Sequence, residues 1–200
     1  MNVLLIGGNG FVGKALIKSL KNNVSYLSRT SNKSEVYNNI KWIQADIFKT
    51  DLSTLNIKNI DIAIHLIGTI KNKSLYKKLN TDSVAKTIEL CKIHGIKKLV
   101  FLSANGGFNS YMVSKLAAEN LVKESGLNYL IVKPGLMYGS HRLSSYINIL
   151  PIKIFAALGF DFFKNVYPLP VDKVAQVISY HLENNINKNI LTLNDIKNFS

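Results

Sequence analysis

The side chains with the clearest potential for chemistry are a tyrosine and a lysine four residues apart, Tyr111 and Lys115. In a helix, residues with this spacing lie on one face, so an ammonium can lie beside the phenol. A phenol with a pKa of about 10 transfers protons poorly near neutral pH, but a nearby positive charge lowers that pKa. The pair predicts proton transfer by Tyr111, with an ordinary amphipathic helix carrying a surface lysine as the alternative.

The same spacing occurs twice more, so position must decide between the three pairs. Tyr129 and Lys133 lie on a predicted strand, where four residues separate them by about 13 Å. Tyr37 and Lys41 straddle a loop and the start of a strand. Only the first pair opens a predicted helix after a buried strand.

A second candidate is the glycine-rich stretch at residues 7–13, between an apolar run and a segment with helical spacing. It fits G-x-G-x-x-G through Gly8, Gly10 and Gly13, and G-x-x-G-x-x-G if Gly7 is the first glycine. Such a turn bends sharply, lets the backbone approach a pyrophosphate and presents the N–H groups of a helix N-terminus. It predicts dinucleotide binding, and the alternative is an ordinary glycine-rich turn.

Arg29 stands where a dinucleotide site would otherwise carry the acid that binds the ribose, about 20 residues after the glycine turn. No acid follows until Glu35, and Arg29 is one of only two arginines in the chain. A guanidinium can pair with a 2′-phosphate through two parallel hydrogen bonds. We therefore expect a preference for NADP(H), with NAD(H) possible. The alternative is a solvated arginine at the end of a strand.

Strand and helix patterns alternate six times along the chain, which predicts an α/β fold with a doubly wound parallel sheet, the Rossmann fold, in a single domain over residues 1–200. The predicted strands are Val3–Ile6, Val24–Leu27, Ile40–Ala45, Ile60–Ile67, Leu99–Leu102 and Tyr129–Val132. The predicted helices are Lys14–Leu20, Leu52–Ile57, Leu75–His94 and Tyr111–Glu124. Ligands of such sheets bind beyond the carboxyl ends of the strands.

The pattern changes after Gly139, and residues 141–170 are expected to form a short apolar cap at the nicotinamide end. Within it, residues 146–163 are strongly apolar and aromatic. They could form an inward lid, an outward patch for a partner or a membrane surface with Lys153 and Lys164, or plain core. An amphipathic helix is predicted at Val171–Leu182, and one more strand at Ile190–Leu193.

Composition excludes several other classes. The single cysteine and four scattered histidines predict no internal disulfide and no metal site. The net charge of +13 comes mostly from dispersed lysines, so we expect no nucleic-acid partner. The uncharged run Ile154–Phe160 is too short to span a bilayer, and the first strand begins by Val3. The expected location is cytoplasmic, with peripheral membrane contact through residues 146–163 left open.

Together these motifs resemble the extended and atypical branch of the short-chain dehydrogenase/reductase superfamily, whose members are NAD(P)-dependent and epimerase/dehydratase-like. The likeness runs from residue 1 to about 193. It is carried by residues 6–13, His65-Leu-Ile-Gly68, Asn80-Thr-Asp-Ser-Val, Leu99-Val-Phe-Leu-Ser103, Tyr111-x-x-x-Lys115, Lys133-Pro-Gly-Leu-Met-Tyr-Gly139 and Pro168-Leu-Pro-Val-Asp-Lys-Val-Ala175.

The resemblance implies roles for individual residues. Tyr111 would be the acid/base, Lys115 would also hold the nicotinamide ribose, Ser103 would orient the reacting groups and Asn80 would hold a water. Asp46 and Ile47 would lie at the adenine, residues 66–68 along the cofactor bridge, and Pro134 beside the nicotinamide. The predicted cofactor-binding residues are Gly7, Asn9, Gly10, Phe11, Val12, Gly13, Ser28, Arg29, Asp46, Ile47, Leu66, Ile67, Gly68, Lys115 and Pro134.

Three departures from the family pattern leave two functions open. Ser103 precedes Tyr111 by only eight residues, Ala104 replaces a second serine, and the chain is much shorter than a typical extended member. The resemblance is strongest to small atypical members, such as the nucleotide-binding accessory subunit of respiratory complex I and a coenzyme Q biosynthesis protein. The chain would be an oxidoreductase acting on a small apolar carbonyl or quinone-like substrate. Alternatively, it would be a non-catalytic NADPH-binding module of a membrane-associated complex.

Overall fold

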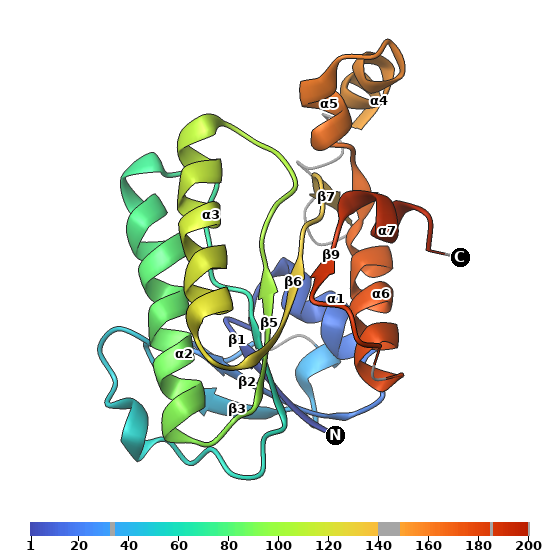
Figure 1. Ribbon diagram of the computed structural model, residues 1–200. Coiled ribbons are helices and arrows are strands. Elements are labelled where there is room, and N and C mark those ends of the chain that lie inside the picture. Colours follow the sequence, from blue (N-terminus) through green and yellow to red (C-terminus); the bar gives the residue numbers. More distant parts are fainter. Residues whose placement is uncertain (33–34, 140–148, 185, 200) are drawn as a thin grey trace.

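A seven-stranded parallel sheet forms the centre of the molecule (Figure 1). The computed structural model describes residues 1–32, 35–139, 149–184 and 186–199. The strand order is β3-β2-β1-β4-β5-β6-β9, and every neighbouring pair is parallel. The strands are β1 (Asn2–Ile6), β2 (Asn23–Ser28), β3 (Lys41–Gln44), β4 (Ile62–His65), β5 (Lys98–Leu102), β6 (Asn128–Val132) and β9 (Ile190–Leu191). The predicted fold class is confirmed.

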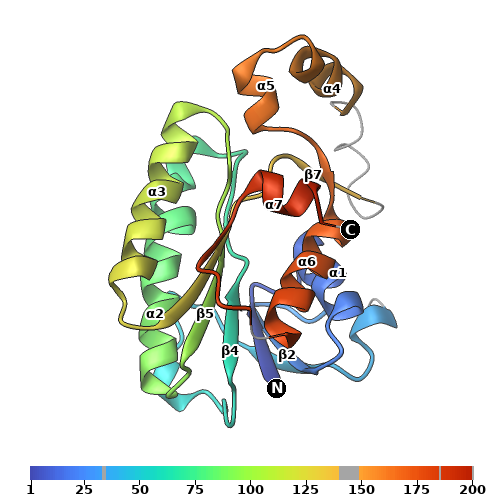
Figure 2. The ribbon, with the colours of Figure 1, turned by 45° about the vertical axis from the view of Figure 1, so that its right-hand side comes forward.

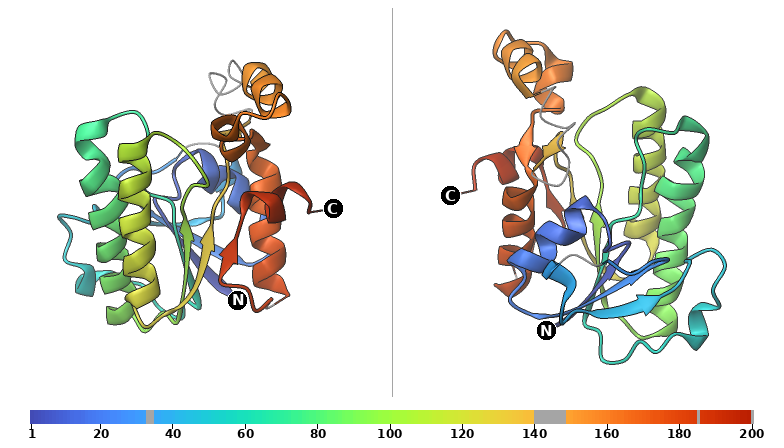
Figure 3. Two further views of the ribbon diagram at one scale, coloured as in Figure 1. Left: turned by 45° about the horizontal axis from the view of Figure 1, so that its top comes forward. Right: turned by 180° about the vertical axis from the view of Figure 1, so that it is seen from behind.

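Helices cover both faces of this sheet (Figures 1 and 3). One face carries α1 (Phe11–Ser19), α6 (Val171–Glu183) and α7 (Leu193–Lys197), and the other carries α2 (Ser83–Ile93) and α3 (Asn109–Glu124). Short turns of helix are η1 (Glu35–Tyr37), η2 (Leu52–Thr54), η3 (Lys73–Leu75) and η4 (Lys77–Asp82). The strands β7 (Met137–Tyr138) and β8 (Leu169–Pro170) pair in a separate small sheet.

The first strand explains why its sequence is apolar without alternation. Val3 and Leu5 pack into the core on the α1/α6 side, whereas Leu4 and Ile6 pack into the core on the α2/α3 side. Successive side chains of a strand point to opposite faces, so a strand covered on both faces needs apolar residues throughout. All four are fully buried.

The long helix expected at Leu75–His94 is interrupted. A π-helical turn, η4, precedes α2 and contains Asn80, which is fully buried. The Asn80 amide exchanges two hydrogen bonds with the backbone of Thr69, at 2.8 and 3.0 Å. Widened turns of this kind often mark functional sites in helices. The helix expected at Leu52–Ile57 is also shorter, a single turn that ends when Leu55 adopts an extended conformation.

Beyond the carboxyl ends of the strands, α4 (Ile149–Ala157) and α5 (Asp161–Asn165) form a helical hairpin that projects from the body (Figure 2). We call residues 149–165 the apolar hairpin. Its side chains are exposed at Leu150, Ile154, Phe155, Leu158, Phe160 and Phe162. The interpretation of these residues as plain core is therefore wrong, because their side chains are exposed. The inward lid and the outward patch stay predictions. Residues 141–148 of the expected cap lie outside the described residues.

The hairpin contacts the loop before α3 through Asn165 and Phe162. The Asn105 side chain donates to the Asn165 carbonyl at 3.1 Å, and a Cβ on Gly106 would lie 2.9 Å from the Cβ of Asn165. The centres of the Phe108 and Phe162 rings lie 6.4 Å apart.

Within the described ranges, no helix combines the length and the apolarity that crossing a bilayer requires.

His65, at the end of β4, is a buried titratable group in the core. Its ring nitrogens lie 2.8 Å from the Thr87 hydroxyl and 3.1 Å from the Ile67 carbonyl. Burial lowers the His65 pKa to about 3, and the charge on Lys115 adds to this effect. The imidazole is therefore neutral in the folded protein at physiological pH.

We expect His65 to make the protein acid-sensitive. Because its pKa is depressed in the folded state, the unfolded chain binds more protons between about pH 6.5 and 3, so stability is lost as the pH falls. The slope should be about 1.4 kcal/mol per pH unit for one proton. His65→Gln should reduce the slope of the unfolding free energy by that amount, measured with urea at several pH values. Equal slopes for the two proteins would refute this assignment.

Candidate functional site

The glycine turn fixes the start of α1 against β1. Gly7 has a φ of +80°, and the Gly8 N–H donates to the Leu5 carbonyl at 3.3 Å. A Cβ on Gly13 would collide with the Gly8 carbonyl, so only glycine allows the helix to pack this closely. This agrees with the role that the sequence pattern assigns to its last glycine.

The N-terminus of α1 is open to an anion. Gly10 caps the helix without a side-chain hydrogen bond, and the first turn contains no acidic residue. The first N–H groups of a helix have no partner within it, and the helix dipole favours negative charge there. A Cβ on Gly10 would meet nothing closer than the Gly7 carbonyl, at 3.6 Å. The predicted residues Phe11 and Val12 supply two of these N–H groups, so the turn fits a pyrophosphate.

Asn9 links this turn to the loop after β2. Its Nδ2 donates to the Thr30 carbonyl at 3.0 Å, and its Oδ1 accepts from the Asn32 side chain. The Ser28 hydroxyl donates to the same Thr30 carbonyl at 2.7 Å. These bonds hold the residues on either side of Arg29 beside the phosphate turn.

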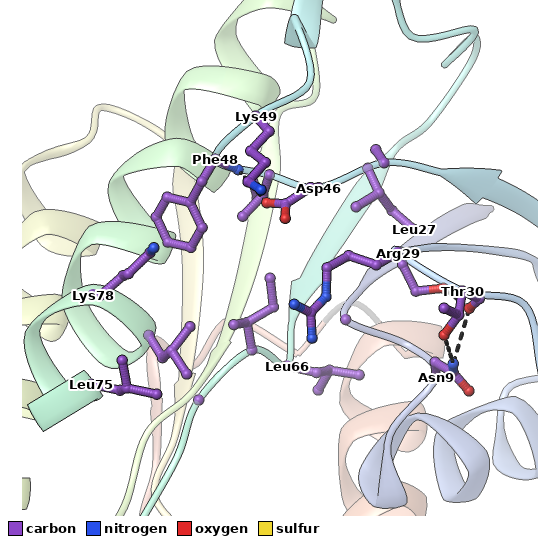
Figure 4. A pocket seen from close by; sticks show the side chains of 17 residues that line it. Asn9, Leu27, Arg29, Thr30, Asp46, Phe48, Lys49, Leu66, Leu75 and Lys78 are labelled. Carbon is purple, nitrogen blue, oxygen red and sulfur yellow. Dashed lines mark hydrogen bonds between the residues drawn. The ribbon is translucent and has the colours of Figure 1, made fainter. Parts of the chain in front are cut away.

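A cavity of about 530 Å³ opens where these segments meet (Figure 4). The predicted cofactor residues that line it are Gly7, Asn9, Ser28, Arg29, Asp46, Ile47, Leu66, Ile67 and Gly68. The cavity therefore occupies the adenosine half and the bridge of the predicted site. The other predicted site residues do not line it; they are Gly10, Phe11, Val12, Gly13, Asn80, Ser103, Tyr111, Lys115 and Pro134.

Arg29 is exposed, and Figure 4 shows its side chain reaching from the end of β2 towards Leu66 on the other side of the cavity. Within the part of the chain that is described, its guanidinium has no acidic partner. Asp46 lines the same cavity, and its carboxylate accepts the Phe48 N–H at 2.9 Å.

Sequence reasoning missed several lining residues, which are Leu27, Thr30, Ala45, Phe48, Lys49, Leu75, Lys78 and Leu79. The Lys78 ammonium lies 5.2 Å from the centre of the Phe48 ring, so these two side chains form one wall. Phe48 could have been found, since it follows Asp46 by two residues. Lys78 had no signal, because it sits among other lysines in a helical pattern.

Asn80 and Lys115 meet at the far end of this cavity, around Gly68. A Cβ on Gly68 would lie 3.2 Å from the Asn80 Oδ1 and 3.5 Å from the Lys115 Nζ. The Asn80 Nδ2 also donates to the Ser114 hydroxyl at 3.0 Å, which joins η4 to α3. Two of the four predicted catalytic residues are thus in one place, beside the predicted cofactor bridge.

Lys115 is buried, and its ammonium is directed into the protein. Its Nζ donates to the Leu102 carbonyl at 2.9 Å and lies 4.9 Å from the centre of the Phe101 ring. Burial lowers the Lys115 pKa to about 8, while the carboxylate of Glu119 raises it.

Tyr111 differs from the sequence expectation. Burial raises the pKa of Tyr111 to about 12, and the neighbouring Tyr76 raises it further. The centres of the two rings lie 5.7 Å apart. The expectation that Lys115 lowers this pKa is wrong for the protein without a cofactor, because the ammonium is held by the Leu102 carbonyl. The phenol is therefore protonated at neutral pH.

Ser103 and Pro134 lie at the ends of β5 and β6. The Ser103 hydroxyl donates to Glu119 at 2.6 Å rather than to Tyr111. The Pro134 carbonyl accepts the Asn105 N–H at 2.9 Å. The predicted roles of these residues, towards Tyr111 and the nicotinamide, stay predictions.

Within the described ranges, no three His, Cys, Asp or Glu side chains gather to hold a metal ion.

The open space at Gly10 gives a test of the phosphate turn. Gly10→Val should abolish dinucleotide binding and leave the fold intact, because the side chain enters free space above the helix N-terminus. Gly13→Ala is the matched contrast, since its Cβ collides with backbone and should lower the unfolding temperature. Calorimetry with NADPH and thermal unfolding measure both effects. Unchanged NADPH affinity in Gly10→Val would remove this turn from the site.

Comparison with known proteins agrees with this geometry. Residues 7–149 match the family model described as NAD(P)H-binding. The chain is 29% identical to the uncharacterized sugar epimerase YhfK of Bacillus subtilis, over 68% of this chain and 72% of that protein. It is 27% identical to Protein HTATIP2 of Rattus norvegicus, over 90% of this chain and 81% of that protein.

Among solved structures, the chain is similar to the UDP-glucuronic acid 4-epimerase from Bacillus cereus in complex with NAD. The TM-score is 0.69 at 20% identity, with 96% of this chain and 75% of that chain covered. At this identity the likeness shows a shared fold. The family match covers more than half of the chain and includes the glycine turn, the cavity and the helix with Tyr111 and Lys115. The chain belongs to the NAD(P)H-binding family, among the extended and atypical short-chain dehydrogenases/reductases.

Proposed function

We propose that this protein is an NADP(H)-dependent oxidoreductase that acts on a small, largely apolar carbonyl or quinone-like compound. The observation that supports it best is the meeting of Asn80 and Lys115 at Gly68, beside the cofactor cavity. NADPH, when bound, supplies a hydride. The residues of this chain bind the phosphates at the glycine turn, position the substrate and provide the proton.

Tyr111 is the proton donor in this proposal. Its pKa of about 12 keeps the phenol protonated at neutral pH, as a reduction requires. Tyr111 lies in the first turn of α3, the helix that also carries Lys115. In the part of the chain described, no protein group accepts a hydrogen bond from its hydroxyl, which leaves it available to a substrate oxygen.

The surroundings of Tyr111 support an apolar substrate. Its ring packs on Tyr76 and on the backbone of Gly107, and Phe108 is 67% exposed at the start of the same helix. Aromatic and apolar walls with few polar groups favour ligands of the same character. An epimerase that acts on a nucleotide sugar, as the name of the Bacillus cereus protein states, would need polar partners for several hydroxyl groups.

Arg29 supports the preference for NADP(H), since its exposed guanidinium reaches across the adenosine cavity without an acidic partner in the described residues. Charge-assisted hydrogen bonds contribute about 1.5–3 kcal/mol. Arg29→Ala should therefore weaken NADPH binding roughly tenfold to a hundredfold and leave NADH binding nearly unchanged. Arg29→Lys should recover part of the loss, because it keeps the charge without the planar fork.

Titration calorimetry with both cofactors measures this difference. Lys97→Ala is the control, since Lys97 is exposed and does not line the cavity. An equal loss of affinity for NADPH and NADH in Arg29→Ala would refute the 2′-phosphate role.

A second candidate function is a non-catalytic NADPH-binding module that regulates a membrane-associated complex. The exposed apolar hairpin favours it, because Leu150 and Leu158 are each 68% exposed on a segment that projects from the body. Large exposed apolar patches commonly mark interaction sites. We propose that a partner protein would dock on the hairpin in this function, and vesicle binding is the other outcome to measure.

Two substitutions separate these functions. If the protein is an enzyme, Tyr111→Phe should abolish turnover with a panel of apolar carbonyl compounds and quinones while NADPH still binds. If it is a module, the cellular function should survive Tyr111→Phe and be lost in Leu158→Asp. Leu158 is preferred to Phe160, whose ring packs on Phe155 and Phe163 within the hairpin. Survival of a cell phenotype in Tyr111→Phe, but not in Leu158→Asp, would overturn the oxidoreductase proposal.

A further inference from the structure

A buried charge cluster lies one helical turn below Lys115. Glu119 is only 2% exposed. Its carboxylate accepts the Ser103 hydroxyl at 2.6 Å, and the Lys133 ammonium lies 3.1 Å from both of its oxygens. Its negative charge also acts on Lys115, whose pKa it raises.

The partners of Glu119 come from the elements that carry the candidate active site. Tyr111, Lys115 and Glu119 are spaced by four residues along α3 and so lie along one face of the helix. Ser103 follows β5 directly, and Lys133 follows β6 directly, next to Pro134. One carboxylate therefore joins α3 to the carboxyl ends of two neighbouring strands.

We propose that Glu119 is a positioning residue, which fixes the ends of β5 and β6 against α3 and so holds the Lys115 side chain in place beside the cofactor cavity. This inference rests on the proposed function, because it assigns Lys115 the task of meeting a bound dinucleotide. It also gives Ser103 a role within the cluster, as a donor to Glu119.

The carboxylate of Glu119 and the ammonium groups of Lys115 and Lys133 stabilise one another, so the three charges depend on each other. Removing one partner of a buried charge pair leaves an uncompensated charge in a medium of low polarity. Without Glu119, Lys115 would face the neutral His65 and the protonated Tyr111, while Lys133 would supply only repulsion. The ammonium of Lys115 would then lose its proton more easily, and its contact with a bound dinucleotide would weaken.

The experiment measures the NADPH dissociation constant by fluorescence between pH 6 and 10. In the wild-type protein, affinity should fall above about pH 8, where Lys115 loses its proton. Glu119→Gln keeps the shape of the side chain and should move this midpoint to lower pH by roughly one unit or more. Lys133→Met should move it the other way, because Glu119 then acts on Lys115 alone.

Controls separate a charge effect from general damage. Glu89→Gln removes a carboxylate from an exposed ion pair on α2 and should leave the midpoint unchanged. Lys115→Met should remove the pH dependence altogether.

The outcomes distinguish the inference from the function on which it rests. If the wild-type protein binds no dinucleotide, both the proposed function and this inference fail. If NADPH binds with the same midpoint in Glu119→Gln, Lys133→Met and wild type, only the role of Glu119 is overturned. If Glu119→Gln does not fold, the double variant Glu119→Gln/Lys133→Met decides, because it removes both members of the buried ion pair and should still move the midpoint to lower pH.

Discussion

The close approach of α1 to the end of β1 is the constraint on which the site depends. Gly13 lies against the Gly8 backbone with no room for a side chain, and this contact aims the helix N-terminus over the edge of the sheet. The same contact leaves the space above Gly10 free. Steric exclusion at one glycine and open space at another thus leave the backbone N–H groups of the helix N-terminus accessible to an anion, and Asn9 attaches the loop that carries Arg29.

How much the sequence predicts depends on the range of the interactions involved. The sheet follows from local patterns, because each strand covered on both faces must be apolar throughout. The adenosine half of the site follows as well, since residues at the carboxyl ends of parallel strands converge without further information. Asp46, Leu66 and Gly68 line the cavity for this reason.

The substrate end could not be predicted in the same way. The pairing of Ser103 with Glu119 and of Lys115 with the Leu102 carbonyl depends on side-chain packing between α3 and the sheet, which no spacing rule encodes. The interruption of the helix at Asn80 has the same origin, because a buried amide there bonds to a distant backbone segment. The apolar hairpin shows a related limit, since hydrophobic composition is equally compatible with burial and with an outward face.

The tether between Asn105 and Asn165 makes the hairpin and the loop before Tyr111 one mechanical unit. A ligand that immobilises the hairpin would therefore also restrict this loop, and a substrate that orders the loop would restrict the hairpin. Such coupling is reciprocal, so each ligand lowers the entropic cost that the other meets. The exposed hairpin and the loop before Tyr111 would therefore be linked thermodynamically through the contacts of Asn165 and Phe162.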